Sequence, residues 1–284
     1  MSILNEIASL RKGDDMTDIP HGLVTGKVLH KIEWTDQLFS LQVSAPVSSY
    51  QAGQFTKLGL RNSEGEFVRR AYSMVNAPEH AKGHQHLEFL IIKDQNGQLS
   101  PQLHQLKVGD DVFVGKDPSG FMTLDEIPEI ADDLWMLSTG TAVGPFISML
   151  ESMQIQQQKD AGLGPEKGKS FKNLVLIHAV RTEQDLTYRD RITQLVQHFQ
   201  GKLQYVPIIS RESVTGTLRG RIPSLLRGGD LERASSITIN QRHSFFYLCG
   251  NPQMVRDTSE ALISLGLQKH LRKKPGQFSS ENYW

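Results

Sequence analysis

The sequence predicts two domains, an antiparallel β-barrel of Greek-key type followed by an α/β domain with a parallel sheet. Its 284 residues are enough for two units that each bury a core. Up to about residue 126, short strand-like runs alternate with turn residues, whereas beyond it apolar runs alternate with helical stretches. We therefore expect a tail over residues 1–20, a barrel over 21–126 and an α/β domain over 127–284.

The barrel half contains five runs of strand composition, separated by turns rich in glycine and asparagine. The expected strands are residues 38–43, 54–60, 71–75, 87–93 and 111–114. One short helix is expected over residues 100–106, with Ser100 as its N-cap and Pro101 at its first position.

The α/β half contains four apolar runs typical of parallel strands. The expected strands are residues 134–138, 174–180, 203–209 and 245–249. A helix is expected to start after Pro145, because Phe146, Met149, Leu150 and Met153 recur at helical spacing and are best explained as core. The polar segment 156–169 contains three glycines and a proline and predicts a surface loop.

Bulk properties exclude several classes of function. The formal net charge is zero, so no global basic field favours nucleic acid or an acidic membrane. A single cysteine excludes an intramolecular disulfide and a cysteine-ligated iron–sulfur cluster in this chain. No apolar run has membrane length and the first 20 residues do not form a signal peptide, so a cytoplasmic protein is expected, with a frayed tail or one short amphipathic turn at its start.

Arg70, Ala71, Tyr72 and Ser73 put a guanidinium, an aromatic ring and a hydroxyl on one short extended segment. A guanidinium can fork onto a pyrophosphate, the ring can lie against a flavin, and the hydroxyl can reach the edge of the flavin. The pattern predicts a flavin site, although an ordinary half-exposed sheet face would have the same alternation.

Two later turns each join a strand to a helix. Residues 140–145 are small, so their backbone can approach a ligand, and the helix that follows favours an anion at its start, although the turn is not a full dinucleotide fingerprint. The second turn follows Cys249 and opens a helix with Asn251 as its expected N-cap and Pro252 as its first residue.

In this order, the three motifs resemble the ferredoxin–NADP+ reductase family, in its bacterial branch that ends in an aromatic pair. The likeness runs from about His21 to Trp284. It implies FAD on the barrel, NADP(H) on the α/β domain, hydride transfer between the nicotinamide and flavin N5, and single-electron transfer with ferredoxin or flavodoxin. A monomer is expected, although the sequence does not determine the oligomeric state.

For FAD, the resemblance implies that Arg70 contacts the pyrophosphate, Tyr72 stacks on the isoalloxazine and Ser73 lies near N5. Ordinary burial in a strand would explain residues 90–92 equally well, and family members often have Tyr where Leu90 stands. The full FAD set implied is Arg70, Ala71, Tyr72, Ser73, Leu90, Ile91, Ile92, Gln98, Leu99, Ser100, Thr141 and Trp284.

For the second nucleotide, arginines near the strand ends indicate NADP rather than NAD. A site for the 2′-phosphate needs an arginine where an NAD site has an acidic residue, and no Asp or Glu ends either strand. Isolated surface arginines are the alternative. The set implied by the resemblance is Thr141, Arg181, Ser210, Arg211, Arg221, Gly250 and Asn251.

The catalytic group implied by the resemblance is Ser73, Cys249, Glu281 and Tyr283. Cys249 would lie by the nicotinamide in a positioning role, although simple packing is the alternative. Tyr283 would cover the flavin face, Trp284 would lie near the adenine, and Glu281 would take part in proton transfer to N5.

A basic run near the chain end would steer an acidic ferredoxin or flavodoxin, although a solvated face is the simpler interpretation. It consists of Lys269, His270, Arg272, Lys273 and Lys274. No histidine pattern predicts a metal. Two other functions stay open at this point: an NAD(P)H-dependent flavin reductase or diaphorase, and a non-catalytic nucleotide-binding redox sensor.

Overall fold

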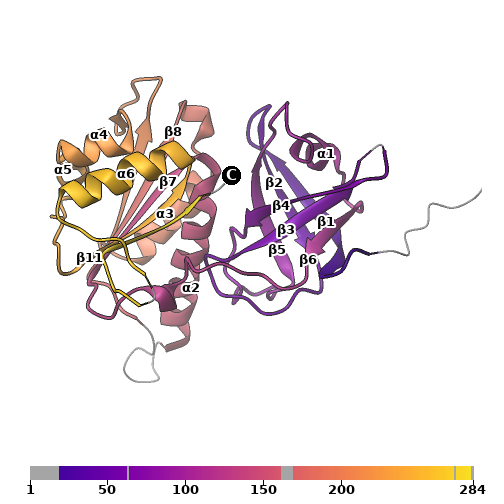
Figure 1. The fold of residues 1–284 in the computed structure, drawn as a ribbon, viewed down its shortest axis with the longest axis horizontal. Coiled ribbons are helices and arrows are strands. Elements are labelled where there is room, and N and C mark those ends of the chain that lie inside the picture. Colours follow the sequence, from indigo (N-terminus) through magenta and orange to yellow (C-terminus); the bar gives the residue numbers. More distant parts are fainter. Residues whose placement is uncertain (1–18, 63, 161–168, 272, 283–284) are drawn as a thin grey trace, which may run out of the picture.

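The computed structural model describes residues 19–62, 64–160, 169–271 and 273–282. Figure 1 shows a barrel and an α/β domain side by side, with one long helix of the α/β domain facing the barrel. The predicted two-domain fold class is confirmed. The expectations for residues 1–18, and for Tyr283 and Trp284, lie outside the described residues.

The barrel is a six-stranded antiparallel sheet in the order β4-β3-β6-β1-β2-β5. An isolated bridge between Met74 and Phe89 joins the two outer strands and closes it. The five expected strands are present, and β4 begins and ends earlier in the chain than expected. The strands are β1 (Leu23–Glu33), β2 (Leu38–Ser44), β3 (Phe55–Arg61), β4 (Phe67–Ser73), β5 (His86–Ile92) and β6 (Asp111–Gly115).

The helix α1 (Ser100–Gln105) has Leu99 as its N-cap, so the expected capping role of Ser100 is wrong. The Ser100 hydroxyl instead accepts a hydrogen bond of 3.0 Å from the backbone N–H of Asp94. Because the hydroxyl closes the preceding turn, it is not used by the amides of its own helix. Pro101 lies in the first turn as expected.

The α/β domain contains a six-stranded sheet in the order β10-β9-β8-β7-β11-β12, with every neighbouring pair parallel. All four expected strands are present. The strands are β7 (Asp133–Thr139), β8 (Asn173–Val180), β9 (Leu203–Ile209), β10 (Leu218–Arg219), β11 (Ser244–Gly250) and β12 (Phe278–Asn282).

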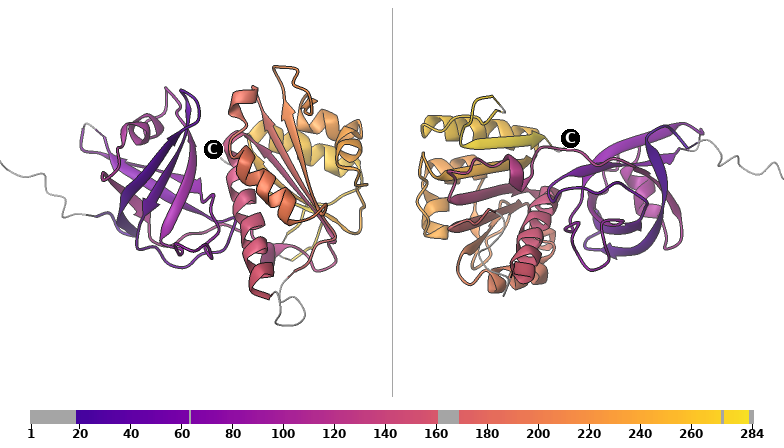
Figure 2. Two further views of the ribbon diagram at one scale, coloured as in Figure 1. Left: turned by 180° about the vertical axis from the view of Figure 1, so that it is seen from behind. Right: turned by 90° about the horizontal axis from the view of Figure 1, so that it is seen from below.

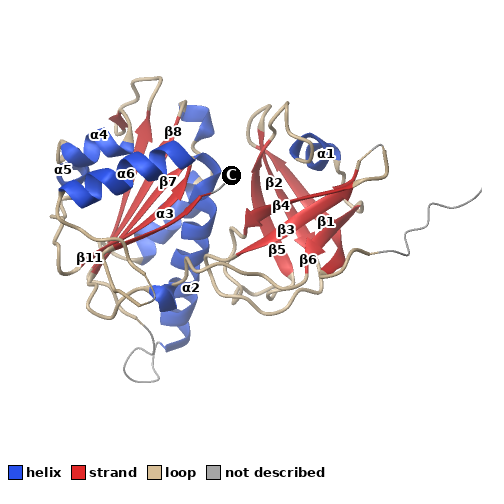
Figure 3. Cartoon of the chain, viewed as in Figure 1, coloured by secondary structure: helices blue, strands red, loops and turns tan. Residues whose placement is uncertain are grey.

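Helices cover both faces of this sheet (Figures 2 and 3). One face carries α2 (Gly144–Asp160) and α3 (Arg189–His198), and the other carries α4 (Ile222–Arg227), α5 (Asp230–Ser235) and α6 (Pro252–Ser264). Short 3-10 turns lie at Leu124–Glu126, Gly140–Val143 and Glu183–Asp185.

Helix α2 continues to Asp160, so the expected loop over 156–169 is wrong in its first part. Residues 156–160 contain no glycine or proline, which allows the helix to continue through them. The Gln156 side chain also donates to the Asp160 carboxylate, one helical turn further on, at 2.9 Å. Residues 161–168 lie outside the described residues.

The two domains share a hydrophobic core. The cluster between the sheet and α2 includes Phe146, Met149, Leu150 and Met153, which confirms the prediction that these side chains are core. Barrel residues join the same cluster; they are Leu38, Ala52, Val75, Leu90 and Met122. Burial of this shared apolar surface fixes the barrel against α2.

Candidate functional site

Strand β4 presents the first motif with Arg70 and Ala71 exposed, Tyr72 half-buried and Ser73 buried. Arg70 donates to the carbonyl of Arg69 at 2.8 Å and pairs with no carboxylate among the described residues. Burial raises the pKa of Tyr72 to about 12, so its phenol is neutral. The motif therefore offers a cationic fork and a neutral aromatic ring on one strand.

The residues expected on β5 and α1 differ in their surroundings. Leu90 is 2% exposed and lies in the shared core, and Ile91 points into the barrel core. Ile92 is 45% exposed. At the start of α1, Gln98 is exposed, whereas Leu99 and Ser100 are buried.

The His178 ring contacts the turn that follows β7. The sequence analysis did not identify this residue. Gly140 has φ +56°, and its carbonyl lies 3.2 Å from His178 Nε2. Burial lowers the pKa of His178 to about 4, so the ring is neutral and its Nε2–H donates to this carbonyl. Thr141 is buried. A histidine inside an otherwise apolar strand was the available signal.

The same turn contacts the barrel. A Cβ at Gly144 would lie 3.1 Å from the Val75 side chain, which follows Ser73 by two residues. Small residues in this turn therefore allow the start of α2 to lie directly against the barrel.

The end of β11 lies beside the end of β7. Gly250 has φ +135°, and a Cβ there would lie 2.1 Å from Thr139 Oγ1. That hydroxyl oxygen accepts from the Asn251 backbone N–H at 2.9 Å. The Asn251 side chain accepts from the amides of Gln253 and Met254, which confirms Asn251 as the N-cap of α6, with Pro252 as its first residue.

Cys249 is buried and pairs in register with Glu281 on β12. Burial and the nearby Glu281 carboxylate raise the pKa of its thiol, which stays protonated. This agrees with a positioning role and not with a nucleophile.

Glu281 connects β12 to the segment between the domains. Its Oε1 accepts from the backbone amides of Phe121 and Met122 at 3.0 and 3.2 Å. Burial raises the pKa of this carboxyl despite both hydrogen bonds. The neighbouring Gly120 lies against Phe55, which pairs with Ser73. The sequence indicated a functional role for Glu281 from its position near the chain end. It did not indicate that the amides of Phe121 and Met122 would donate to its carboxylate.

The arginines expected at the second nucleotide lie at the carboxyl ends of β8 and β9. Arg181 and Arg211 are joined by a backbone hydrogen bond of 3.0 Å, and Ser210 donates to the carbonyl of Val180. Arg221 is the N-cap residue of α4, just after β10. Within the described part of the chain, none of the three exposed guanidinium groups has a hydrogen-bond or ion-pair partner.

These surroundings fit the two expected cofactors. Unpaired like charges at one sheet edge are stabilised by a phosphate dianion, and the glycine at 250 lets the end of β11 lie directly against Thr139 of β7. On the barrel, Arg70 and the Tyr72 ring suit a pyrophosphate and a flavin. Among the described residues, no three His, Cys, Asp or Glu side chains form a metal-binding group.

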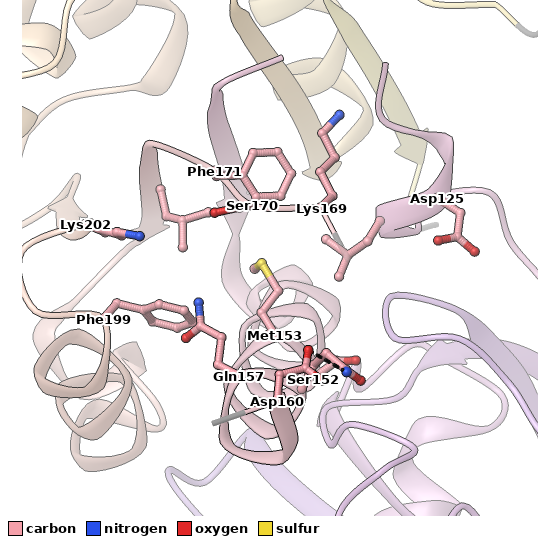
Figure 4. Close-up of a pocket in the computed structure, with 13 residues that line it drawn as sticks. Asp125, Ser152, Met153, Gln157, Asp160, Lys169, Ser170, Phe171, Phe199 and Lys202 are labelled. Carbon is pink, nitrogen blue, oxygen red and sulfur yellow. Dashed lines mark hydrogen bonds between the residues drawn. The ribbon is translucent and has the colours of Figure 1, made fainter. Parts of the chain in front are cut away.

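A pocket of about 230 Å³ lies at the far end of α2 and contains none of the predicted site residues (Figure 4). Phe171, Met153 and Phe199 line it, with Lys169 at its edge. It is separate from the predicted cofactor sites, and Leu124 and Asp125 from the segment between the domains also line it. In the part of the chain that the structure describes, no helix has the length and apolar character to cross a bilayer.

Each half of the chain matches a known family of protein domains. Residues 27–122 match the family described as oxidoreductase FAD-binding domain, and residues 136–260 match the oxidoreductase NAD-binding domain. The chain therefore contains an FAD-binding and an NAD(P)-binding domain.

Similar proteins span nearly the whole chain. The flavodoxin/ferredoxin–NADP reductases of Shigella flexneri and Escherichia coli K12 are 47% and 46% identical over 262 residues, 92% of this chain and 98% of each relative. A ferredoxin NADP+ reductase from Neisseria gonorrhoeae, solved with bound FAD and NADP, superimposes with a TM-score of 0.81 at 31% identity, covering 93% of this chain and 100% of that one. The chain thus belongs to the flavodoxin/ferredoxin–NADP reductase family of oxidoreductases.

Proposed function

We propose that this protein is a cytoplasmic, monomeric FAD enzyme that exchanges electrons between NADP(H) and a ferredoxin or flavodoxin. The bound flavin would accept a hydride from the nicotinamide at N5 and pass electrons on singly. We further propose residues 21–126 as the FAD-binding domain and 127–284 as the NADP-binding domain, with residues 1–20 as a tail.

The observation that carries this proposal is that Glu281 connects the two proposed cofactor sites. We call them the flavin half-site (Arg70, Tyr72 and Ser73) and the NADP half-site (Arg181, Arg211, Arg221 and Cys249). On one side Glu281 pairs with Cys249 at the end of β11. On the other it holds the segment beside Phe55, the strand partner of Ser73. A reaction between two bound cofactors requires their reactive ends to meet, and Glu281 connects residues near both proposed sites, which supports the proposal.

Each half-site supplies a different function. Arg70 binds the FAD pyrophosphate and Tyr72 stacks on the flavin, while Arg181, Arg211 and Arg221 bind the 2′-phosphate of NADP. The protonated thiol of Cys249 packs beside the nicotinamide, and Glu281 exchanges a proton near N5. Tyr283 and Trp284 are proposed to cover the flavin and adenine.

The basic run supports an acidic protein partner. Lys269, Lys273 and Lys274 are exposed, and their positive charge would accelerate encounter with an acidic ferredoxin or flavodoxin. Net charge over the whole chain is zero, so this attraction is local.

The test is to purify the protein and mix it with NADPH without oxygen. We expect one tightly held FAD, bleaching of the flavin band by NADPH, and reoxidation of the flavin by an oxidised ferredoxin or flavodoxin. Protein that is colourless and takes up no FAD would contradict the proposal. Release of reduced flavin into solution would instead indicate a flavin reductase.

A further inference from the structure

A polar cluster joins the two domains on the side of β5 that faces α3, with Ser40, Glu88 and Tyr188 buried and its other members partly buried. It consists of Trp34, Ser40 and Glu88 from the barrel and of Glu151, Tyr188 and Arg191 from the α/β domain. None of these six residues belongs to the proposed cofactor or catalytic sets. Polar side chains at a domain boundary require partners from the opposite domain if they are to stay buried.

Tyr188 is at the centre of this cluster. Its side chain is 6% exposed, and its hydroxyl lies 2.6 Å from Ser40 Oγ and donates to Glu88 Oε1 at 2.7 Å. Its ring packs on Trp34 with centroids 4.9 Å apart. The backbone of Tyr188 has φ 59°, which is unfavourable for a residue with a side chain. Contacts across the boundary therefore hold this residue in a strained conformation.

Arg191 bridges two carboxylates from opposite domains. It contacts Glu88 of β5 at 3.1 Å and forks onto both oxygens of Glu151 of α2. Glu151 also accepts from the backbone N–H of Ala77 in the barrel at 3.3 Å. A two-point guanidinium contact fixes direction as well as distance, so the bridge restricts rotation between the domains.

Short segments of ordered backbone connect the cluster to the two proposed half-sites. On the barrel side, Glu88 precedes Leu90, where β5 enters the shared core, by two residues. On the other side, the segment from Arg181 to Tyr188 is closed by a capping box of Thr182 and Asp185. Movement of Tyr188 would therefore displace the loop that carries Arg181.

We propose that Tyr188, with Glu88 and Arg191, positions the NADP half-site against the flavin half-site and so sets the geometry of hydride transfer. These are positioning residues, since none of them belongs to the proposed cofactor contacts. The inference rests on the proposed function. It predicts that loosening the cluster slows the chemical step and changes the affinity for each cofactor little, because most of the contacts proposed for each cofactor lie within one domain, with Thr141 and Trp284 as the exceptions.

The decisive variant is Tyr188→Phe, which removes one hydroxyl and keeps the ring on Trp34. A misplacement of about 1 Å can cost a hundredfold in rate, so loss of one of several contacts should slow single-turnover flavin reduction by NADPH about tenfold. Binding of NADP+ and FAD should change less than about twofold. NADPH deuterated at the transferred position should still show an isotope effect, which identifies hydride transfer as the slowed step.

Tyr205→Phe is the matched control. It removes a phenol hydroxyl from β9 of the same domain, and this hydroxyl only approaches His178 at 3.5 Å. Flavin reduction in this variant should match the unmodified protein. Ser40→Ala removes the hydroxyl on the barrel side and should slow the reaction in the same way if Tyr188→Phe fails to fold.

Combining Tyr188→Phe with Glu88→Gln tests whether the two residues act through one contact. The double variant should be no slower than the slower single variant. An unchanged rate in Tyr188→Phe, or a fall in rate matched by an equal loss of NADP+ affinity, would overturn the inference. Failure of the proposed function is distinguished because the unmodified protein would then show no flavin reduction, or would release the reduced flavin into solution.

Discussion

At the scale of single residues, Arg211 is notable for what its side chain does not contact. Its guanidinium is exposed at the end of β9, and no described residue hydrogen-bonds or pairs with it. Arg189 and Arg233, in contrast, pair with carboxylates of the same domain. A cation that the fold leaves unpaired is available for an anionic ligand.

We expect Arg211→Ala to lower kcat/KM for NADPH about ten- to a hundredfold and to leave NADH almost unchanged. The lost interaction with a charged phosphate is worth about 1.5–3 kcal/mol, and about 1.4 kcal/mol corresponds to tenfold. Steady-state kinetics with both nucleotides measure this. Arg256→Ala, an exposed arginine on α6, is the control and should change neither. Equal losses with both nucleotides would place Arg211 away from the 2′-phosphate.

His178 predicts a pH dependence of stability. Its pKa is about 4 in the folded protein and 6.5 without burial, so between these values the unfolded chain binds a proton that the folded one does not. Above about pH 6.5 the ring is neutral in both states and the folded protein carries no penalty from it. As the pH falls below 6.5, protonation stabilises the unfolded chain, so the free energy of unfolding decreases. Between pH 7 and 5 we expect a loss of about 2 kcal/mol from this group.

The measurement is urea unfolding at both pH values, compared between the unmodified protein and His178→Gln. The variant should lose about 2 kcal/mol less over this range, since it has no ring to protonate. His84→Gln leaves the buried ring in place and should retain the full pH dependence. The same loss in all three proteins would assign the effect to other groups.

At the scale of elements, β12 contacts the segment between the domains through the side chain of Glu281. Glu281 Oε1 accepts from the amides of Phe121 and Met122. Removing the acceptor leaves two backbone donors to be satisfied by water in a partly buried place, at a cost of about 1–3 kcal/mol.

Glu281→Ala and Glu281→Gln should therefore behave differently. The glutamine keeps an oxygen acceptor, so its free energy of unfolding should stay close to that of the unmodified protein, whereas the alanine should lose about 1–3 kcal/mol. Both should slow turnover with NADPH, because neither side chain exchanges a proton. Urea unfolding and turnover with a ferredoxin measure the two effects. Full activity in the glutamine variant would contradict a proton-transfer role.

The elements show which parts of the fold were predictable. The expected strands were found because apolar runs between turn residues have few other interpretations. Strands β1, β10 and β12 were missed. β1 carries polar residues and Gly26, which lies close to Val43 and Val114, and β12 reads Phe-Ser-Ser-Glu-Asn. Such sequences become strands because neighbouring strands pair with them. A local sequence pattern carries no information about this pairing.

The site was predictable to a similar degree. The turn after β11 correctly predicted Asn251 as the N-cap of α6, whereas the ligand contacts of Arg70 and Cys249 stay predictions. The hydrogen bond between Tyr188 and Glu88 joins residues 100 positions apart. A contact of this kind depends on how the two domains pack, and no spacing in the sequence encodes it.

At the scale of the whole molecule, the shared core predicts that the two domains unfold together. Met149 of α2 is fully buried in that core, and its methyl group lies beside Gly53 of the barrel. When two domains bury one cluster, unfolding either exposes the apolar surface of the other, which couples their stabilities.

This coupling is testable by hydrogen exchange under increasing denaturant, followed separately in peptides from β2 and from α6. In the unmodified protein both peptides should open at one midpoint. Leu41→Ala lies within the barrel core and Leu262→Ala on the distant face of the sheet, and each should cost about 2–5 kcal/mol and shift both midpoints equally. Met149→Ala removes a contact between the domains and should separate the two midpoints. If Leu41→Ala shifts only the barrel peptide, the domains unfold independently and the shared core does not couple them.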